Sequence, residues 1–162
     1  MAISVGESVP AATLLKHGAE GPEPVTSEAL FAGRRVALFA VPGAFTGTCT
    51  NTHVPSVIAA AAALSAKGVD EIACLSVNDP FVMQAWGKST GASEAGITML
   101  ADADSAFTKA LGMDFTAPPV GLFARSMRYS MLVEDGVVKL LNVEESPGAA
   151  EVSLGSVLVD QI

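Results

Sequence analysis

Residues 35–53 read RVALFAVPGAFTGTCTNTH, and the rest of the chain is organised around this stretch. The apolar run from Arg35 to Val41 predicts a buried strand. A Pro/Gly turn follows, and the alanine-rich segment from Val54 to Ala66 has the composition of a helix. Cys49 is therefore expected where a strand has ended, a turn breaks the chain and a helix begins.

The position of Cys49 predicts a reactive thiol. Thr48 or Thr50 can serve as the helix N-cap, which puts Cys49 within about one residue of the first turn. Unpaired backbone N–H groups and the positive end of the helix macrodipole converge there, and both favour a thiolate over a thiol. Thr46 precedes the cysteine closely, and its hydroxyl can donate one hydrogen bond and accept another. This turn is where we expect chemistry.

Composition and charge narrow the class of protein. The 162 residues are 50% hydrophobic and carry a formal net charge of −8, so we expect no nucleic-acid surface, which needs clustered Lys and Arg. The length favours a single domain over residues 1–162, with no internal repeat or linker. Two cysteines are too few for a disulfide scaffold and indicate a reducing compartment.

No segment predicts membrane insertion or export. The longest apolar run, Val57 to Leu64, is too short to cross a bilayer. Residues 1–7 lack the positive and apolar regions of a signal peptide and are not an Arg-rich transit sequence. We therefore expect a cytoplasmic protein with no membrane partner, with organellar import through a removed presequence as the open alternative.

The segments on either side of the cysteine turn predict further elements. Residues 1–33 favour a short strand, a Gly/Pro-rich surface loop from Gly18 to Pro24 and a brief helix from Ser27 to Phe31. The helix after the cysteine is expected over residues 50–67, bent near its start by Pro55.

The rest of the chain predicts an α/β fold. Glu71–Val77 is typical of a central parallel strand, so strand, helix and strand form a right-handed βαβ unit. Asp79-Pro80 places an N-cap before a proline and starts a second helix. Residues 128–133 and 137–143 flank an Asp-Gly turn and predict a hairpin, and Glu151–Ile162 predicts a terminal helix. This order predicts a thioredoxin-like fold with a central mixed β-sheet flanked by helices.

The cysteine turn resembles the active site of the peroxiredoxin family. Pro42-x-x-x-Thr46-x-x-Cys49 matches the family pattern Pro-x-x-x-Thr/Ser-x-x-Cys. The longer string over residues 41–55 is similar to the type II (peroxiredoxin-5-like) branch.

Two later blocks resemble the same branch and occur in the same order. They are residues 74–83, CLSVNDPFVM, and residues 128–131, RYSM. One departure is Gly47, where type II sequences usually carry a second proline. Glycine leaves φ free in the turn before the cysteine and changes none of the reactive groups.

The resemblance implies a thiol-dependent peroxidase that acts on hydrogen peroxide and alkyl hydroperoxides. Cys49 would be the peroxidatic thiolate and would become a sulfenic acid. Thr46 and Arg128 would orient the peroxide and stabilise the leaving oxygen, and Pro42 would shield the thiolate from water. Arg125 is the competing arginine, and we favour Arg128 because it begins the RYSM string.

Each of these residues also has a structural interpretation. Free cysteines are usually buried and inert, Thr46 suits a Pro/Gly turn, and Pro42 can simply end a strand. His53, about one helical turn after Cys49, could be a core or surface histidine, a neighbour that favours the thiolate, or a metal ligand. We assign His53 a supporting role at most.

The role of Cys74 stays open at this point. Strand alternation groups it with Ile72 and Ser76 on one face, where a small apolar residue would simply pack. Within the type II branch, some members are thought to resolve the sulfenic acid through a cysteine at this position. Capture of oxidised Cys49 by glutathione or a glutaredoxin is the alternative.

The resemblance also implies the partners. These are thioredoxin, glutaredoxin or glutathione as reductant and a second copy of the chain in a homodimer, with no metal, haem, flavin or other cofactor. The rival interpretation is a redox sensor or holdase chaperone that signals through oxidation of the same cysteine. A disulfide reductase is not favoured, because the chain has no Cys-x-x-Cys motif.

Overall fold

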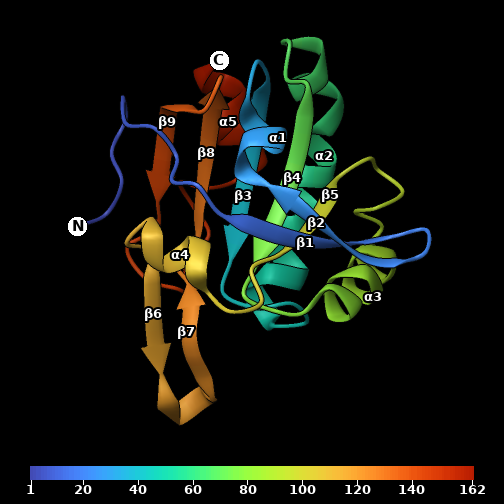
Figure 1. Cartoon of the computed structure of the whole chain (residues 1–162), viewed down its shortest axis with the longest axis vertical. Helices are drawn as coiled ribbons and strands as arrows, with labels where there is room; N and C mark the ends of the chain where they lie inside the picture. The colour runs from blue at the N-terminus through green and yellow to red at the C-terminus, as the bar shows by residue number, and fades with distance from the viewer.

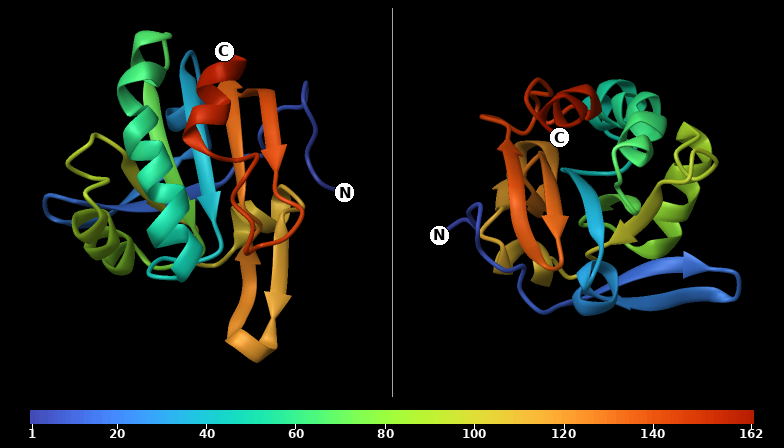
Figure 2. Two further views of the ribbon diagram at one scale, coloured as in Figure 1. Left: turned by 180° about the vertical axis from the view of Figure 1, so that it is seen from behind. Right: turned by 90° about the horizontal axis from the view of Figure 1, so that it is seen from above.

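The computed structural model describes residues 1–162 and has a large mixed β-sheet with helices on both faces (Figures 1 and 2). The strand order is β2-β1-β5-β4-β3-β8-β9, in which β3, β4 and β5 run parallel and the other pairings are antiparallel. This is the predicted thioredoxin-like arrangement. The strands are β1 (Thr13–Gly18), β2 (Gly21–Thr26), β3 (Arg35–Val41), β4 (Glu71–Ser76), β5 (Thr98–Ala101), β8 (Tyr129–Glu134) and β9 (Val137–Val143).

The helices divide between the two faces of this sheet. They are α1 (Ser27–Phe31), the π-helical turn η1 (Cys49–His53), α2 (Val54–Ala66), α3 (Pro80–Thr90), α4 (Ala106–Ala110) and α5 (Gly155–Gln161). None of them has the length and hydropathy that crossing a lipid bilayer requires.

Strand alternation produces two apolar cores. On one face, α2, α3 and α5 cover a core that contains Phe39, Cys49 and Cys74. On the other face, α1 and α4 cover a core that contains Leu38 and Phe107. Leu38 and Phe39 are successive residues of β3 and therefore point to opposite faces. Both cysteines belong to the same core.

Two of the predicted turns are confirmed in detail. Asp79 is the N-cap of α3, and its Oδ1 accepts a hydrogen bond from the Val82 N–H at 2.8 Å. Asp135 and Gly136 join β8 to β9 with φ angles of 48° and 77°, as a tight hairpin turn with two left-handed residues requires.

Two other predictions were wrong in their boundaries. The expected surface loop from Gly18 to Pro24 largely belongs to a hairpin, because Pro22 and Pro24 lie in β2. An edge strand tolerates residues without an N–H, and β2 is at the edge of the sheet. The terminal helix was expected from residue 151 but begins at Gly155.

The sequence did not predict the small second sheet. Strands β6 (Asp114–Ala117) and β7 (Leu122–Ser126) pair antiparallel and are joined by the 3-10 turn η2 (Pro118–Val120). This hairpin extends away from the body of the molecule (Figure 1). Its short strands and the Pro-Pro pair in its turn give no clear alternation of apolar and polar residues.

Candidate functional site

The turn after β3 brings Cys49 to the carboxyl end of the central strands. Phe45 has φ of 63°, a left-handed conformation that is uncommon for residues other than glycine. Asn78, which follows β4, supports the turn, because its side-chain oxygen accepts a hydrogen bond from the Ala44 N–H at 3.0 Å. The loops after two parallel strands are therefore joined beside the cysteine.

The helix after the cysteine does not begin as predicted. Cys49–His53 form a π-helical turn in which the Val54 N–H donates to the Cys49 carbonyl, and such turns are frequent at functional sites. Neither candidate threonine caps it. The Thr48 hydroxyl donates to the Gly148 carbonyl at 3.2 Å, and the Thr50 hydroxyl accepts from an indole N–H of α3 at 3.0 Å. Thr48 occupies the N-cap position, but neither threonine makes a capping bond, because both side chains bond to other elements.

Arg128, the residue before β8, contacts Cys49 directly. Its Nη2 donates to Cys49 Sγ at 3.1 Å. Arg128 is 2% exposed and Cys49 is 1% exposed, so the contact is closed to bulk water. Arg128 takes part in none of the three salt bridges of the chain. The buried guanidinium therefore has no carboxylate in direct contact.

His53 holds the other side of the guanidinium. Its Nδ1 lies 3.0 Å from Arg128 Nη1 and must accept, because a guanidinium can only donate. The proton is therefore on Nε2, which donates to the Ser153 carbonyl at 2.9 Å. Burial and the Arg128 charge lower the pKa of His53 to about 4, so the ring is neutral at pH 7.

Both ring nitrogens of His53 already have partners within the protein. No group of three or more His, Cys, Asp or Glu side chains is arranged to hold a metal ion. His53 is instead placed as a neutral acceptor that fixes Arg128.

An open hollow of about 250 Å³ lies in front of this cluster. Arg128 lines this hollow and Cys49 does not. Cys49 Sγ is linked to the hollow through its hydrogen bond from Arg128. The Thr46 hydroxyl at its wall donates to the Gly43 carbonyl at 2.8 Å. The lining residues come from the cysteine turn, the β6–β7 hairpin, the residue before β8 and the loop before α5, and include Pro42, Thr46, Phe115, Val120, Leu122, Arg128 and Pro147.

Arg125 lies against the backbone of the cysteine turn. Its Nη1 donates to the Pro42 carbonyl at 3.2 Å. A Cβ added at Gly43 would lie 2.7 Å from the same Nη1, so glycine permits this close approach. The structure thus brings Arg128 to Cys49 and Arg125 to Pro42.

Cys74 is close to Cys49 in the core but is held differently. It lies within β4, opposite Phe39 on β3 and Met99 on β5. Burial raises the pKa of the Cys74 thiol, and the nearby Cys49 acts in the same direction. Both cysteines are free and buried.

Sequence reasoning missed the loop between β9 and α5. The Pro147 carbonyl accepts from Arg128 Nε at 3.3 Å and from Nη2 at 3.1 Å. The same loop supplies the Ser153 carbonyl that holds His53. Backbone carbonyls leave no residue-type signal in a sequence, so only the fold reveals these contacts.

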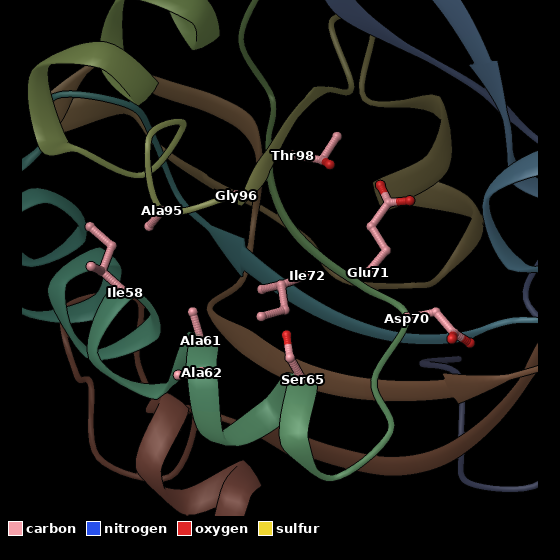
Figure 3. Close-up of a pocket in the computed structure, with 10 residues that line it drawn as sticks. All are labelled: Ile58, Ala61, Ala62, Ser65, Asp70, Glu71, Ile72, Ala95, Gly96 and Thr98. Carbon is pink, nitrogen blue, oxygen red and sulfur yellow. The ribbon is translucent and has the colours of Figure 1, made fainter.

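A larger hollow of about 590 Å³ lies elsewhere, between α2, the start of β4 and the loop before β5 (Figure 3). Its two acidic residues are already engaged. An Asp70 oxygen accepts from the Arg35 N–H at 2.8 Å, and Glu71 pairs with Arg34 at 2.7 Å. No nucleophilic cysteine or histidine lines this hollow, so it does not compete as a thiol site.

Comparisons with known proteins show the family of the chain. The Redoxin family model matches residues 4–158. The chain is 52% identical over 147 residues to Peroxiredoxin-2E-2, chloroplastic, from Oryza sativa subsp. japonica, covering 88% of this chain and 65% of that protein. It therefore spans less than two thirds of that relative. It is 44% identical to Peroxiredoxin-2C from the same organism, with 88% of each chain covered.

A solved structure is similar over nearly the full length. This is reduced Prx3 in complex with H2O2 from Vibrio vulnificus, with 49% identity, a TM-score of 0.91 and 98% of each chain covered. The fold and these matches define a protein of the thioredoxin-like class. The chain belongs to the peroxiredoxin family. Its curated relatives confirm the predicted type II branch.

His53 is expected to make the protein less stable as the pH falls from about 6.5 to about 4. In this window the unfolded chain binds a proton at His53 and the folded chain does not, so stability rises with pH and falls on acidification. The contribution is about 3 kcal/mol at most. Urea unfolding across this pH range measures it. His53→Asn should flatten the dependence relative to wild type, with His17→Asn as the control for loss of a histidine. Identical pH profiles for wild type and His53→Asn would contradict the assignment.

Proposed function

We propose that this chain is a thiol peroxidase whose nucleophile is the Cys49 thiolate. The observation that carries the proposal is the 3.1 Å hydrogen bond from Arg128 to Cys49 Sγ inside the core. A buried cation with no carboxylate in contact favours the thiolate over the thiol. The pair therefore supplies a charged nucleophile together with the group that stabilises it.

The reaction follows from the groups around the sulfur. The thiolate attacks the terminal oxygen of a hydroperoxide, so that an S–O bond forms as the O–O bond breaks. Sulfur is oxidised to the sulfenic acid, and the leaving oxygen takes a proton to become water or an alcohol. Arg128 can donate to the leaving oxygen as negative charge develops on it.

Thr46 and Pro42 act on the peroxide from the wall of the hollow. The Thr46 hydroxyl donates a hydrogen bond to the Gly43 carbonyl, so its lone pairs are available to accept a hydrogen bond from the peroxide O–H. Pro42 keeps water from the thiolate. Apolar hairpin side chains such as Val120 and Leu122 also line the hollow and suit an alkyl group. We propose hydrogen peroxide and alkyl hydroperoxides as substrates.

An external thiol is the proposed reductant, either glutathione or the thiol of a thioredoxin or glutaredoxin. Cys74 lies in β4, which pairs with strands on both sides, whereas Cys49 begins the π-helical turn η1, so oxidised Cys49 moves more readily than Cys74. A disulfide would need Cα atoms within about 7 Å and some unwinding of η1. Both cysteines are free, which favours a reducing compartment, and both the cytoplasm and an organelle satisfy this.

A second copy of the chain is the proposed partner. Phe45, Val120 and Phe123 are each more than half exposed. Val120 lines the hollow, and Phe45 and Phe123 are next in sequence to its lining residues Thr46 and Leu122. Exposed apolar side chains that gather in this way are typical of protein interfaces. A homodimer would cover them and narrow the entrance.

Arg128→Met should lower the second-order rate with hydrogen peroxide by about 10²- to 10³-fold, the range for loss of a group that stabilises developing charge. Arg125→Met is the matched control and should change the rate far less, because Arg125 bonds to the Pro42 carbonyl. Cys49→Ser should abolish turnover. Stopped-flow kinetics on folded variants measures all three. An unchanged rate in Arg128→Met, or more than trace activity in Cys49→Ser, would overturn the proposal.

Peroxide-treated protein should carry sulfenic acid on Cys49, or a glutathione adduct when glutathione is added, with Cys74 still free. Mass spectrometry of the intact and digested protein measures this. Cys74→Ala should sustain peroxide consumption with an external thiol. A Cys49–Cys74 disulfide would show that Cys74 resolves the intermediate. A single stoichiometric oxidation without turnover, whichever thiol is supplied, would favour the redox-sensor or holdase alternative.

Val120→Asp should weaken the homodimer, because a carboxylate would enter an apolar interface. Sedimentation over a range of protein concentrations measures the assembly. Val5→Asp changes another exposed valine, far from the hairpin in sequence, and should leave it unchanged. A wild-type protein that stays monomeric at high concentration would refute the homodimer.

A further inference from the structure

We propose that the Glu144 carboxylate is a positioning group for the peroxidatic site. It holds the loop over residues 144–153 in the shape that fixes Arg128 and His53 against Cys49. This inference rests on the proposed function, since it names what keeps the proposed nucleophile and its cation together. Glu144 touches none of the reacting atoms and acts through the loop.

The Glu144 side chain closes the loop on itself. Glu144 directly follows β9 and is 3% exposed. Its Oε2 accepts hydrogen bonds from the Glu151 N–H at 2.8 Å, the Ser153 N–H at 2.8 Å and the Ser153 hydroxyl at 2.6 Å. It takes part in none of the salt bridges. The carboxylate therefore bonds the start of the loop to residues near its end.

These bonds keep Glu144 charged. Burial alone would raise the pKa of Glu144, but hydrogen bonds from Ser153, Glu151 and Val152 outweigh it and hold the pKa below the usual value. Hydrogen bonds to a charged acceptor are shorter and stronger than neutral ones. An ionised Glu144 thus fixes the loop more firmly than a neutral side chain of the same shape.

The loop in turn supplies two of the contacts that orient the guanidinium. The Pro147 carbonyl accepts from Nε and Nη2 of Arg128, and the Ser153 carbonyl holds His53, which accepts from Nη1. The Glu144 N–H also donates to the Arg128 carbonyl at 3.0 Å. Figure 2 (left) shows this loop passing the end of the sheet from β9 before it turns back to α5. The remaining contact of the guanidinium is with Cys49 Sγ.

The hydrogen bonds to Glu144 are not needed to attach α5 to the rest of the protein. The Gly155 N–H donates to the Ser56 hydroxyl at 3.1 Å, and the Ser56 hydroxyl donates to the His53 carbonyl at 2.6 Å. The start of α5 therefore has its own anchor on α2. The three bonds to Glu144 shape the segment before that anchor, where the carbonyls that hold Arg128 and His53 lie.

Glu144→Gln tests the inference, because it keeps the shape of the side chain and removes its charge. The expected result is a loss of about 10- to 100-fold in the rate of Cys49 with hydrogen peroxide, since small misplacements of a reacting group have effects of this size. The thiolate fraction of Cys49, followed by ultraviolet absorbance against pH, should fall in parallel. Glu145→Gln removes the same charge from the exposed neighbouring residue and should change neither quantity.

Ser153→Ala is the second variant and keeps the main-chain bonds while removing one donor to Glu144. It should lower the rate with hydrogen peroxide less than Glu144→Gln does. If Glu144→Gln does not fold, Ser153→Ala tests the inference in its place. Urea unfolding gives the fraction of each variant that is folded, and each rate is divided by this fraction. If the folded variants keep the wild-type rate and the wild-type thiolate fraction of Cys49, the positioning role is overturned, even when their stability is lower. Cys49→Ser separates this outcome from failure of the proposed function, which would show as activity without the cysteine.

Discussion

The hydrogen bond between Arg128 and Cys49 is the interaction on which the rest of the structure depends. A buried guanidinium costs several kcal/mol unless its donors are satisfied. Here the acceptors come from η1, which supplies Cys49 and His53, and from the loop before α5, which supplies Pro147. The sheet brings these segments together because β3 pairs with both β4 and β8. The segments that satisfy the buried charge are therefore the ones that follow β3 and β9.

Local signals made much of the fold predictable. A buried strand, a Pro/Gly turn, the Asp79 N-cap and the Asp135-Gly136 turn depend on residues adjacent in sequence. The β6–β7 hairpin and β2 also pair with neighbours in sequence, but the prolines in β2 and the short strands and register shift of β6 and β7 hide the alternation that predicts a strand. The π-helical turn at Cys49 is a tertiary effect, because the threonines that could have capped a helix bond to Gly148 and α3.

The parts of the candidate site that consist of side chains could be predicted from the sequence. The parts that consist of backbone carbonyls could not. Cys49 and Arg128 are 79 residues apart, and only the resemblance of their motifs linked them before the structure did. The carbonyls of Pro147 and Ser153 could have belonged to any residue type. Glu144 and Glu145 are adjacent and chemically identical, yet only Glu144 is buried and bonded to the loop. Residue identity cannot distinguish them, because burial is decided by the path of the chain after β9.

The two cysteines separate the effect of burial from the effect of neighbours. Both are almost fully buried in one core, so exposure does not distinguish them. Cys74 is fixed in the middle of β4 among apolar side chains, and burial there favours the neutral thiol. Cys49 has a guanidinium in contact and begins a π-helical turn, which is less regular than a strand between two partners. The nucleophile that we propose must be shielded before oxidation and reachable after it, so it needs both a fixed charge beside it and a backbone that opens at lower cost than the sheet.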